Sequence, residues 1–105
     1  GKWEAALSSI RTVDELLSRI VPAVTKRGGI VTITADHGNA EQLWDPTTNQ
    51  PHTAHTTNPV PILFCGEELI GVKPREVGVL GDVAPTLLEM AGIEKPKEMS
   101  GVSLL

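Results

Sequence analysis

Two adjacent residues in the middle of the sequence could bind a metal ion. Asp36 and His37 begin the run Asp36-His37-Gly38-Asn39, directly after a β-branched segment. A carboxylate supplies an oxygen ligand and a neutral imidazole supplies a nitrogen, and both suit Mn²⁺ or Zn²⁺. Neighbouring ligands require the chain to leave strand geometry, which Gly38 permits. An Asx-type turn that ends a strand, with His37 exposed, would explain the same residues without a metal.

Two further histidines lie in a polar run at residues 52–59. This run is part of the longer segment PHTAHTTNPVP at residues 51–61. His52 and His55 have a His-x-x-His spacing that can bind one metal ion, but a loop does not fix its geometry, and two solvated histidines are the alternative. If the flanking strands are parallel and the loop folds back, His55 reaches the same sheet edge as Asp36 and His37. His52 fits better as an outer or surface residue.

The charge pattern around the histidines favours a cation. The 105-residue chain has 13 acidic and 9 basic side chains and a net charge of −4. Residues 28–72 contain no lysine or arginine, yet they hold all three histidines and several carboxylates. Such a segment suits a cation better than a bare phosphate, although a solvated polar loop has the same composition. The acidic balance argues against a nucleic-acid partner held by bulk positive charge.

Composition argues against several other classes. No apolar run approaches the ~20 residues that a membrane span needs, so we expect no membrane partner. The single cysteine, Cys65, excludes an internal disulfide framework and fits a cytoplasmic setting. The sequence has no glycine-rich phosphate-binding loop and no serine with a neighbouring base. Lys73 and Arg75, in a proline-containing turn, are interpreted as surface charges.

The first element expected is a long helix. Apolar residues recur three and four apart over residues 3–24, as on one helix face. Pro22 cannot donate a backbone hydrogen bond, so it predicts a kink, and the glycines at 28–29 predict the helix end. A break into two helices at a Thr12–Glu15 capping box is the alternative.

Two strands and a second helix are expected after it. The β-branched residues 30–34 predict a buried, parallel-type strand, and residues 60–65 predict another. The polar residues between them, 35–58, predict a long loop. Asp82 is a favourable N-cap for a second helix that ends at Gly92.

This order of elements predicts an α/β fold with a partial parallel sheet in an α/β/α sandwich. Two strands cannot complete such a sheet, because parallel sheets are buried on both faces. We therefore expect residues 1–105 to be one part of a larger α/β domain. We also expect the isolated chain to be poorly folded or self-associated.

Four segments resemble the cofactor-independent phosphoglycerate mutase family, within the alkaline-phosphatase superfamily. They are TADHGNAEQ at 34–42, PHTAHTTNPVP at 51–61, LGDVAPTLL at 80–88 and KEMSGVSL at 97–104. Asp-His-Gly-Asn occurs across the superfamily, whereas its combination with the second segment is much more specific. The resemblance covers essentially the whole chain and implies an alkaline-phosphatase-like fold.

The resemblance also implies an activity and a metal set. The family interconverts 3-phosphoglycerate and 2-phosphoglycerate in glycolysis, through a phosphoserine and without 2,3-bisphosphoglycerate. It uses two divalent metal ions, usually Mn²⁺. Asp36 and His37 match ligands of the ion that activates the serine, and His55 matches a ligand of the other ion. The substrate implied is a small molecule, phosphoglycerate, and the full-length enzyme is expected to be a monomer.

The family's serine nucleophile, its remaining metal ligands and its substrate-binding arginines have no counterpart in these residues. We therefore expect residues 1–105 to be the carboxyl-terminal part of the phosphatase-like metal-binding domain, inactive alone. A phosphopentomutase or phosphatase of the same superfamily is one alternative. A non-catalytic metal-binding module is another.

Overall fold

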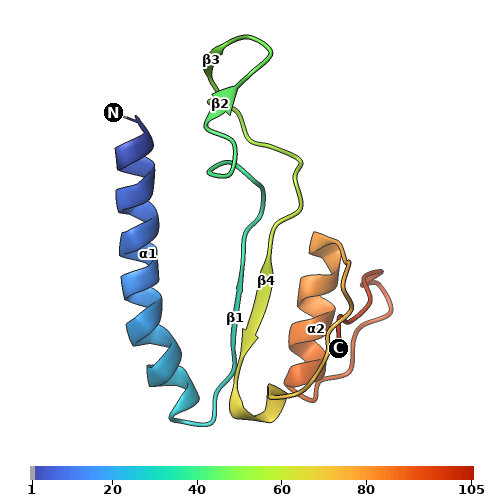
Figure 1. The fold of residues 1–105 in the computed structure, drawn as a ribbon. Coiled ribbons are helices and arrows are strands. Elements are labelled where there is room, and N and C mark those ends of the chain that lie inside the picture. The colour runs from blue at the N-terminus through green and yellow to red at the C-terminus, as the bar shows by residue number, and fades with distance from the viewer. Residues whose placement is uncertain (1) are drawn as a thin grey trace. The chain divides into compact units, whose positions relative to one another are not determined.

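The computed structural model describes residues 2–105, which form two units (Figure 1). The first unit ends at Ile70, and the second covers Gly71–Leu105. The helices and strands in chain order are α1 (Lys2–Thr25), β1 (Val31–Thr34), β2 (Trp44–Asp45), β3 (Gln50–Pro51), β4 (Ile62–Cys65) and α2 (Val83–Met90). Short 3-10 turns at Glu67–Leu69 and Leu80–Asp82 follow β4 and precede α2.

The first helix, α1, continues through Pro22. Thr12 lies in its interior, where the hydroxyl donates to the carbonyl of Ser8 at 3.0 Å. The alternative break with a Thr12–Glu15 capping box is therefore wrong. Gly28, with φ of +76°, ends the turn after the helix, as the glycine pair predicts. The chain then reverses, and β1 runs back beside α1 (Figure 1).

The two main strands, β1 and β4, pair antiparallel, with Val31 opposite Cys65 and Thr34 opposite Ile62. The predicted parallel relation between them is wrong. A parallel pair needs a crossover that returns the chain to the opposite end of the sheet, usually through a helix. The described connection between β1 and β4 contains no helix. The chain therefore enters β4 at the same end of the strand pair at which it leaves β1.

The predicted long loop contains a small hairpin that the sequence analysis missed. In β2 and β3, Trp44 pairs with Pro51 and Asp45 pairs with Gln50. The carboxylate of Asp45 accepts the backbone N–H of Thr47 at 2.8 Å, which stabilises the turn and lowers the pKa of that carboxyl. Strands of two residues are too short to leave a period-two pattern in the sequence.

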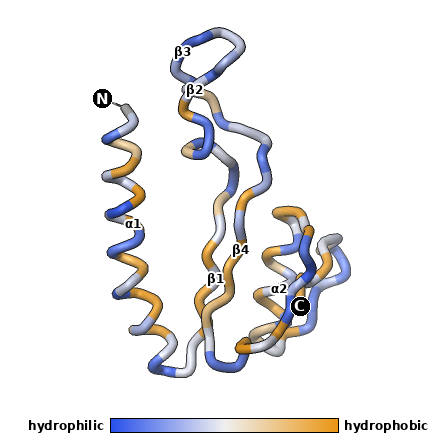
Figure 2. The backbone as a smooth tube through the Cα atoms, viewed as in Figure 1, coloured by the Kyte–Doolittle hydropathy of each residue, from blue (hydrophilic) through white to orange (hydrophobic). Residues whose placement is uncertain are grey.

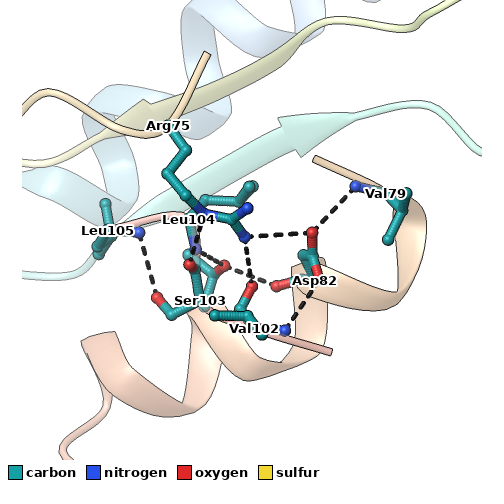
Figure 3. A network of polar contacts seen from close by, with 8 residues as sticks. Arg75, Val79, Asp82, Val102, Ser103, Leu104 and Leu105 are labelled. Carbon is teal, nitrogen blue, oxygen red and sulfur yellow. Dashed lines mark hydrogen bonds and ion pairs between the residues drawn. The ribbon is translucent and has the colours of Figure 1, made fainter. Parts of the chain in front are cut away.

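The second unit is organised around Asp82, at the start of α2. Asp82 occupies the expected N-cap position, but its carboxylate makes no capping bond to α2. It accepts the backbone N–H groups of Val79 at 3.0 Å and Val102 at 2.9 Å, and the guanidinium of Arg75 at 3.2 Å (Figure 3). The interpretation of Arg75 as a simple surface charge is therefore wrong. Arg75 also donates to the carbonyl of Ser103 at 3.1 Å, which holds the tail in place.

Thr86 and Leu104 lie at the centre of this unit. Thr86 is fully buried, and its hydroxyl donates to the carbonyl of Asp82 at 2.6 Å. The same hydroxyl accepts the backbone N–H of Leu104 at 2.9 Å. Leu104 is buried as well, and so is Pro85 in the first turn of α2.

Much of the apolar surface is exposed. Figure 2 shows hydrophobic positions recurring along α1. Several of these are large side chains that face solvent, namely Trp3, Ile10, Val13, Leu16 and Ile20. Within residues 2–105, no helix is both long enough and apolar enough to span a bilayer.

Candidate metal centre

The antiparallel pairing of β1 and β4 brings the candidate ligands together. The carboxyl end of β1 lies beside the amino end of β4, so the residues after β1 meet those before β4. Gly38 forms a bridge with Thr56, whose backbone N–H donates to the carbonyl of Gly38 at 2.9 Å. The shared edge was predicted for parallel strands, yet antiparallel pairing is what produces it.

His37 and His55 stack face to face across this bridge. Their ring centroids are 3.6 Å apart, and the ring planes differ by 13°. The lone pair of an imidazole nitrogen lies in the plane of its ring. The lone pairs of two nearly parallel rings therefore lie in two separate planes. One ion cannot lie in both planes, so the two rings cannot both bind it with in-plane geometry. The stack suits two neighbouring ions, which in two-metal sites lie about 3.5–4 Å apart.

Asp36 and His37 present two donor atoms to the same region. The ring Nδ1 of His37 lies 3.1 Å from the carbonyl of Gly38. A carbonyl can only accept, so in the neutral ring Nδ1 carries the hydrogen and Nε2 holds the free lone pair. This Nε2 lies 3.6 Å from Oδ1 of Asp36. Two donors of one tetrahedral ion are about 3.4 Å apart at ordinary ligand distances, so the pair fits a shared ion.

The described residues do not form a complete metal site by themselves. Across residues 2–105, no group of three or more His, Cys, Asp or Glu side chains is arranged to hold one ion. Asp36 is also largely exposed, with 87% of its side-chain surface accessible. The geometry therefore provides one pair of donors, Asp36 and His37, and a third donor on the stacked ring of His55. An ion bound at either place would need further ligands.

Comparison with known proteins identifies the family of this chain. Residues 1–95 match the family model described as the metalloenzyme superfamily. The chain belongs to the metalloenzyme superfamily. The sequence prediction of an incomplete α/β fold of the alkaline-phosphatase type is thereby confirmed.

Phosphoglycerate mutases match the chain along its whole length. The chain is 53% identical to the 2,3-bisphosphoglycerate-independent phosphoglycerate mutase of Pseudomonas putida and 55% identical to that of Acetivibrio thermocellus. Both alignments cover 100% of this chain and 20% of the relative. The chain thus spans about a fifth of the length of these relatives. The resemblance noted from the four sequence segments is confirmed.

A solved structure of a phosphoglycerate mutase also matches the fold. It is the Leishmania mexicana phosphoglycerate mutase, crystallised at low cobalt concentration. The TM-score is 0.67 at 29% identity, and the match covers 92% of this chain and 20% of that one.

Glu41 is a residue of this metalloenzyme segment that the sequence analysis did not single out. Its carboxylate accepts the hydroxyl of Thr56, the side-chain amide of Asn58 at 3.1 Å and the backbone N–H of Asn39 at 2.7 Å. These hydrogen bonds, the one from Thr56 above all, lower the pKa of Glu41 to about 2. The available signal was the lack of lysine and arginine in residues 28–72, which leaves hydroxyls and amides as the partners of a carboxylate.

His52 directly follows β3 of the hairpin and is not part of the stacked pair. Its backbone N–H donates to the carbonyl of Leu43 at 3.0 Å. Its ring Nδ1 is buried without a hydrogen-bond partner among the described residues. The structure thus separates the two histidines of the His-x-x-His spacing and places only His55 against His37.

Proposed function

We propose that this chain is part of a divalent-metal-dependent phosphoglycerate mutase and supplies ligands to a two-metal centre. The observation that carries the proposal is the stacked pair of His37 and His55, with Asp36 beside it. The identity of 51–55% to phosphoglycerate mutases over the whole chain supports the substrate. A cytoplasmic, glycolytic role belongs to the same proposal.

Each candidate ligand has a distinct part in this centre. Asp36 and Nε2 of His37 would hold one ion, and His55 would hold the other. Manganese is the proposed metal, since carboxylate and imidazole donors both suit it. When bound, such ions offset charge on phosphoryl oxygens and lower the pKa of a bound hydroxyl. The hydrogen bond from Nδ1 of His37 to Gly38 orients this ring for its task.

We also propose that residues 1–105 form the carboxyl-terminal part of the metal-binding domain. Three ligands shared between two ions leave both ions incomplete, so further ligands must come from other segments. The exposed apolar side chains of α1 provide a surface on which such segments can pack. The 105 residues alone should therefore show no mutase activity.

The test uses the natural-length gene product that carries this chain. Conversion of 3-phosphoglycerate to 2-phosphoglycerate is followed without 2,3-bisphosphoglycerate, before and after EDTA treatment and after Mn²⁺ is restored. The proposal predicts activity that chelation abolishes and Mn²⁺ recovers. A folded, Mn²⁺-loaded protein that hydrolyses phosphate esters or isomerises pentose phosphates instead would overturn the substrate assignment. Activity that survives complete metal removal would overturn the metal assignment.

A further inference from the structure

The carboxylate of Glu41 connects the two segments that carry the candidate ligands. One oxygen, Oε2, accepts the backbone N–H of Asn39, two residues after His37. The other, Oε1, accepts the hydroxyl of Thr56 and the amide of Asn58, just after His55. Glu41 belongs to the segment after β1, and its carboxylate bonds both within that segment and across to the segment before β4.

We propose that Glu41 is a positioning residue that presets the separation of the two ligand-bearing segments before metal binds. This inference rests on the proposed function, since it assigns Glu41 a role in the same centre. It assigns Glu41 no direct metal contact, because both carboxylate oxygens are engaged by hydrogen-bond donors.

The chemistry of the site calls for a carboxylate at this position. Three donors from Asn39, Thr56 and Asn58 converge on it, and an ionised carboxylate is a strong acceptor-only group. Its pKa of about 2 keeps it ionised throughout the neutral range. A glutamine has one acceptor oxygen and an NH₂ group, so at least one of the three donors would face another donor.

The contact between the segments is also too close to tolerate added bulk. A Cβ atom at Gly38 would clash with Oγ1 of Thr56 and with Oε1 of Glu41. The side-chain amide of Asn39 adds a weaker link to the carbonyl of Ala54 at 3.4 Å. The ring stack of His37 on His55 is formed directly beside this junction. Loss of the carboxylate should therefore make the relative position of the His37 and His55 rings less fixed.

The test measures Mn²⁺ and Co²⁺ binding to the natural-length protein by calorimetry. Glu41→Gln and Thr56→Val should each weaken Mn²⁺ binding by about 10-fold or more, as for other outer residues of metal sites. The double variant should lose little beyond either single variant, because both remove the same contact. Glu68→Gln, an exposed residue with the same change of charge, should bind as the wild type does.

A spectroscopic readout separates positioning from general stability. The visible absorption bands of bound Co²⁺ report ligand geometry, and they should change in Glu41→Gln but not in Glu68→Gln. Unchanged affinity and an unchanged Co²⁺ spectrum in folded Glu41→Gln would overturn the positioning role while leaving the proposed function intact. If Glu41→Gln does not fold, Thr56→Val decides by the same two readouts. A wild-type protein that binds no Mn²⁺ would instead overturn the proposed function and this role with it.

Discussion

His37 and His55 stack with ring centroids 3.6 Å apart, although 17 residues separate them in the sequence. One follows β1 and the other precedes β4, and the antiparallel pairing of these strands closes the distance. Since the rings are nearly parallel, each can direct an in-plane nitrogen to its own ion. The pairing of these two short strands thus places the two rings where the proposed two-metal centre needs them.

The first prediction separates the two histidines of the His-x-x-His spacing. In the natural-length protein, His55→Ala should lower Mn²⁺ occupancy and phosphoryl transfer severely, beyond the roughly 10–100-fold that loss of an outer residue costs. His52→Ala should have a much smaller effect, because His52 bonds to Leu43 beside the hairpin and is not part of the stack. Metal content by elemental analysis and turnover measure both. Equal losses in the two variants would mean that the ligand is wrongly assigned.

A second prediction concerns the space at Gly38. Gly38→Ala should destabilise the junction by about 1–3 kcal/mol, the usual cost of overpacking, because the new methyl group clashes with Thr56 and Glu41. Weaker Mn²⁺ binding should accompany this loss. The matched control is Gly81→Ala, where a Cβ meets no atom within 4 Å. Thermal unfolding compares the two variants, and equal stability would contradict the packing described for Gly38.

A third prediction concerns the buried hydroxyl of Thr86. Thr86→Val keeps the shape but leaves the N–H of Leu104 without its acceptor, at a cost of about 1–3 kcal/mol. Hydrogen exchange at residues 102–105 should become faster as a result. Thr53→Val, at an exposed position, should leave that exchange unchanged. Unaltered protection in Thr86→Val would show that the tail is held by other contacts.

A fourth prediction follows from the lowered pKa of Asp82. The backbone N–H of Val102 is the main cause, with further contributions from the N–H of Val79 and from Arg75. The folded pKa lies below the ordinary value of 3.8, so the stabilisation is complete above that value and disappears as pH falls through the folded pKa.

Thermal unfolding of wild type and Asp82→Asn between roughly pH 5 and pH 2 tests this dependence. The wild type should be the more stable protein at the upper end, and the difference should shrink as pH falls. Other titrating groups, Glu41 included, are present in both proteins and cancel in the comparison. A difference that stays constant with pH would contradict the assignment.

The elements with long sequence patterns were predictable. The apolar stripe over residues 3–24 and the β-branched residues 30–34 correspond to α1 and β1. Strand direction did not follow from alternation or branching, because these patterns are the same in parallel and antiparallel strands. The lack of a helical pattern in residues 35–58 was the usable signal, since a parallel crossover usually needs a helix.

Some features of the candidate site could also be predicted from the sequence, and others could not. The residue types and the strand ends predicted that Asp36, His37 and His55 share one edge. The ring stack was not predictable, because it depends on which residues pair across the two segments. The bonds of Glu41 to Thr56 and of Arg75 to Asp82 were missed for the same reason. Each joins side chains whose proximity is decided by tertiary structure, and neither leaves a periodic trace in the sequence.

The most direct measurement is anomalous scattering at the manganese edge from crystals of the natural-length protein grown with Mn²⁺. Our account predicts two peaks, one about 2.2 Å from Nε2 of His37 and beside Asp36, and the other at a comparable distance from a ring nitrogen of His55. The peaks should lie about 3.5–4 Å apart. A single ion shared by both rings, or peaks remote from both, would contradict the account.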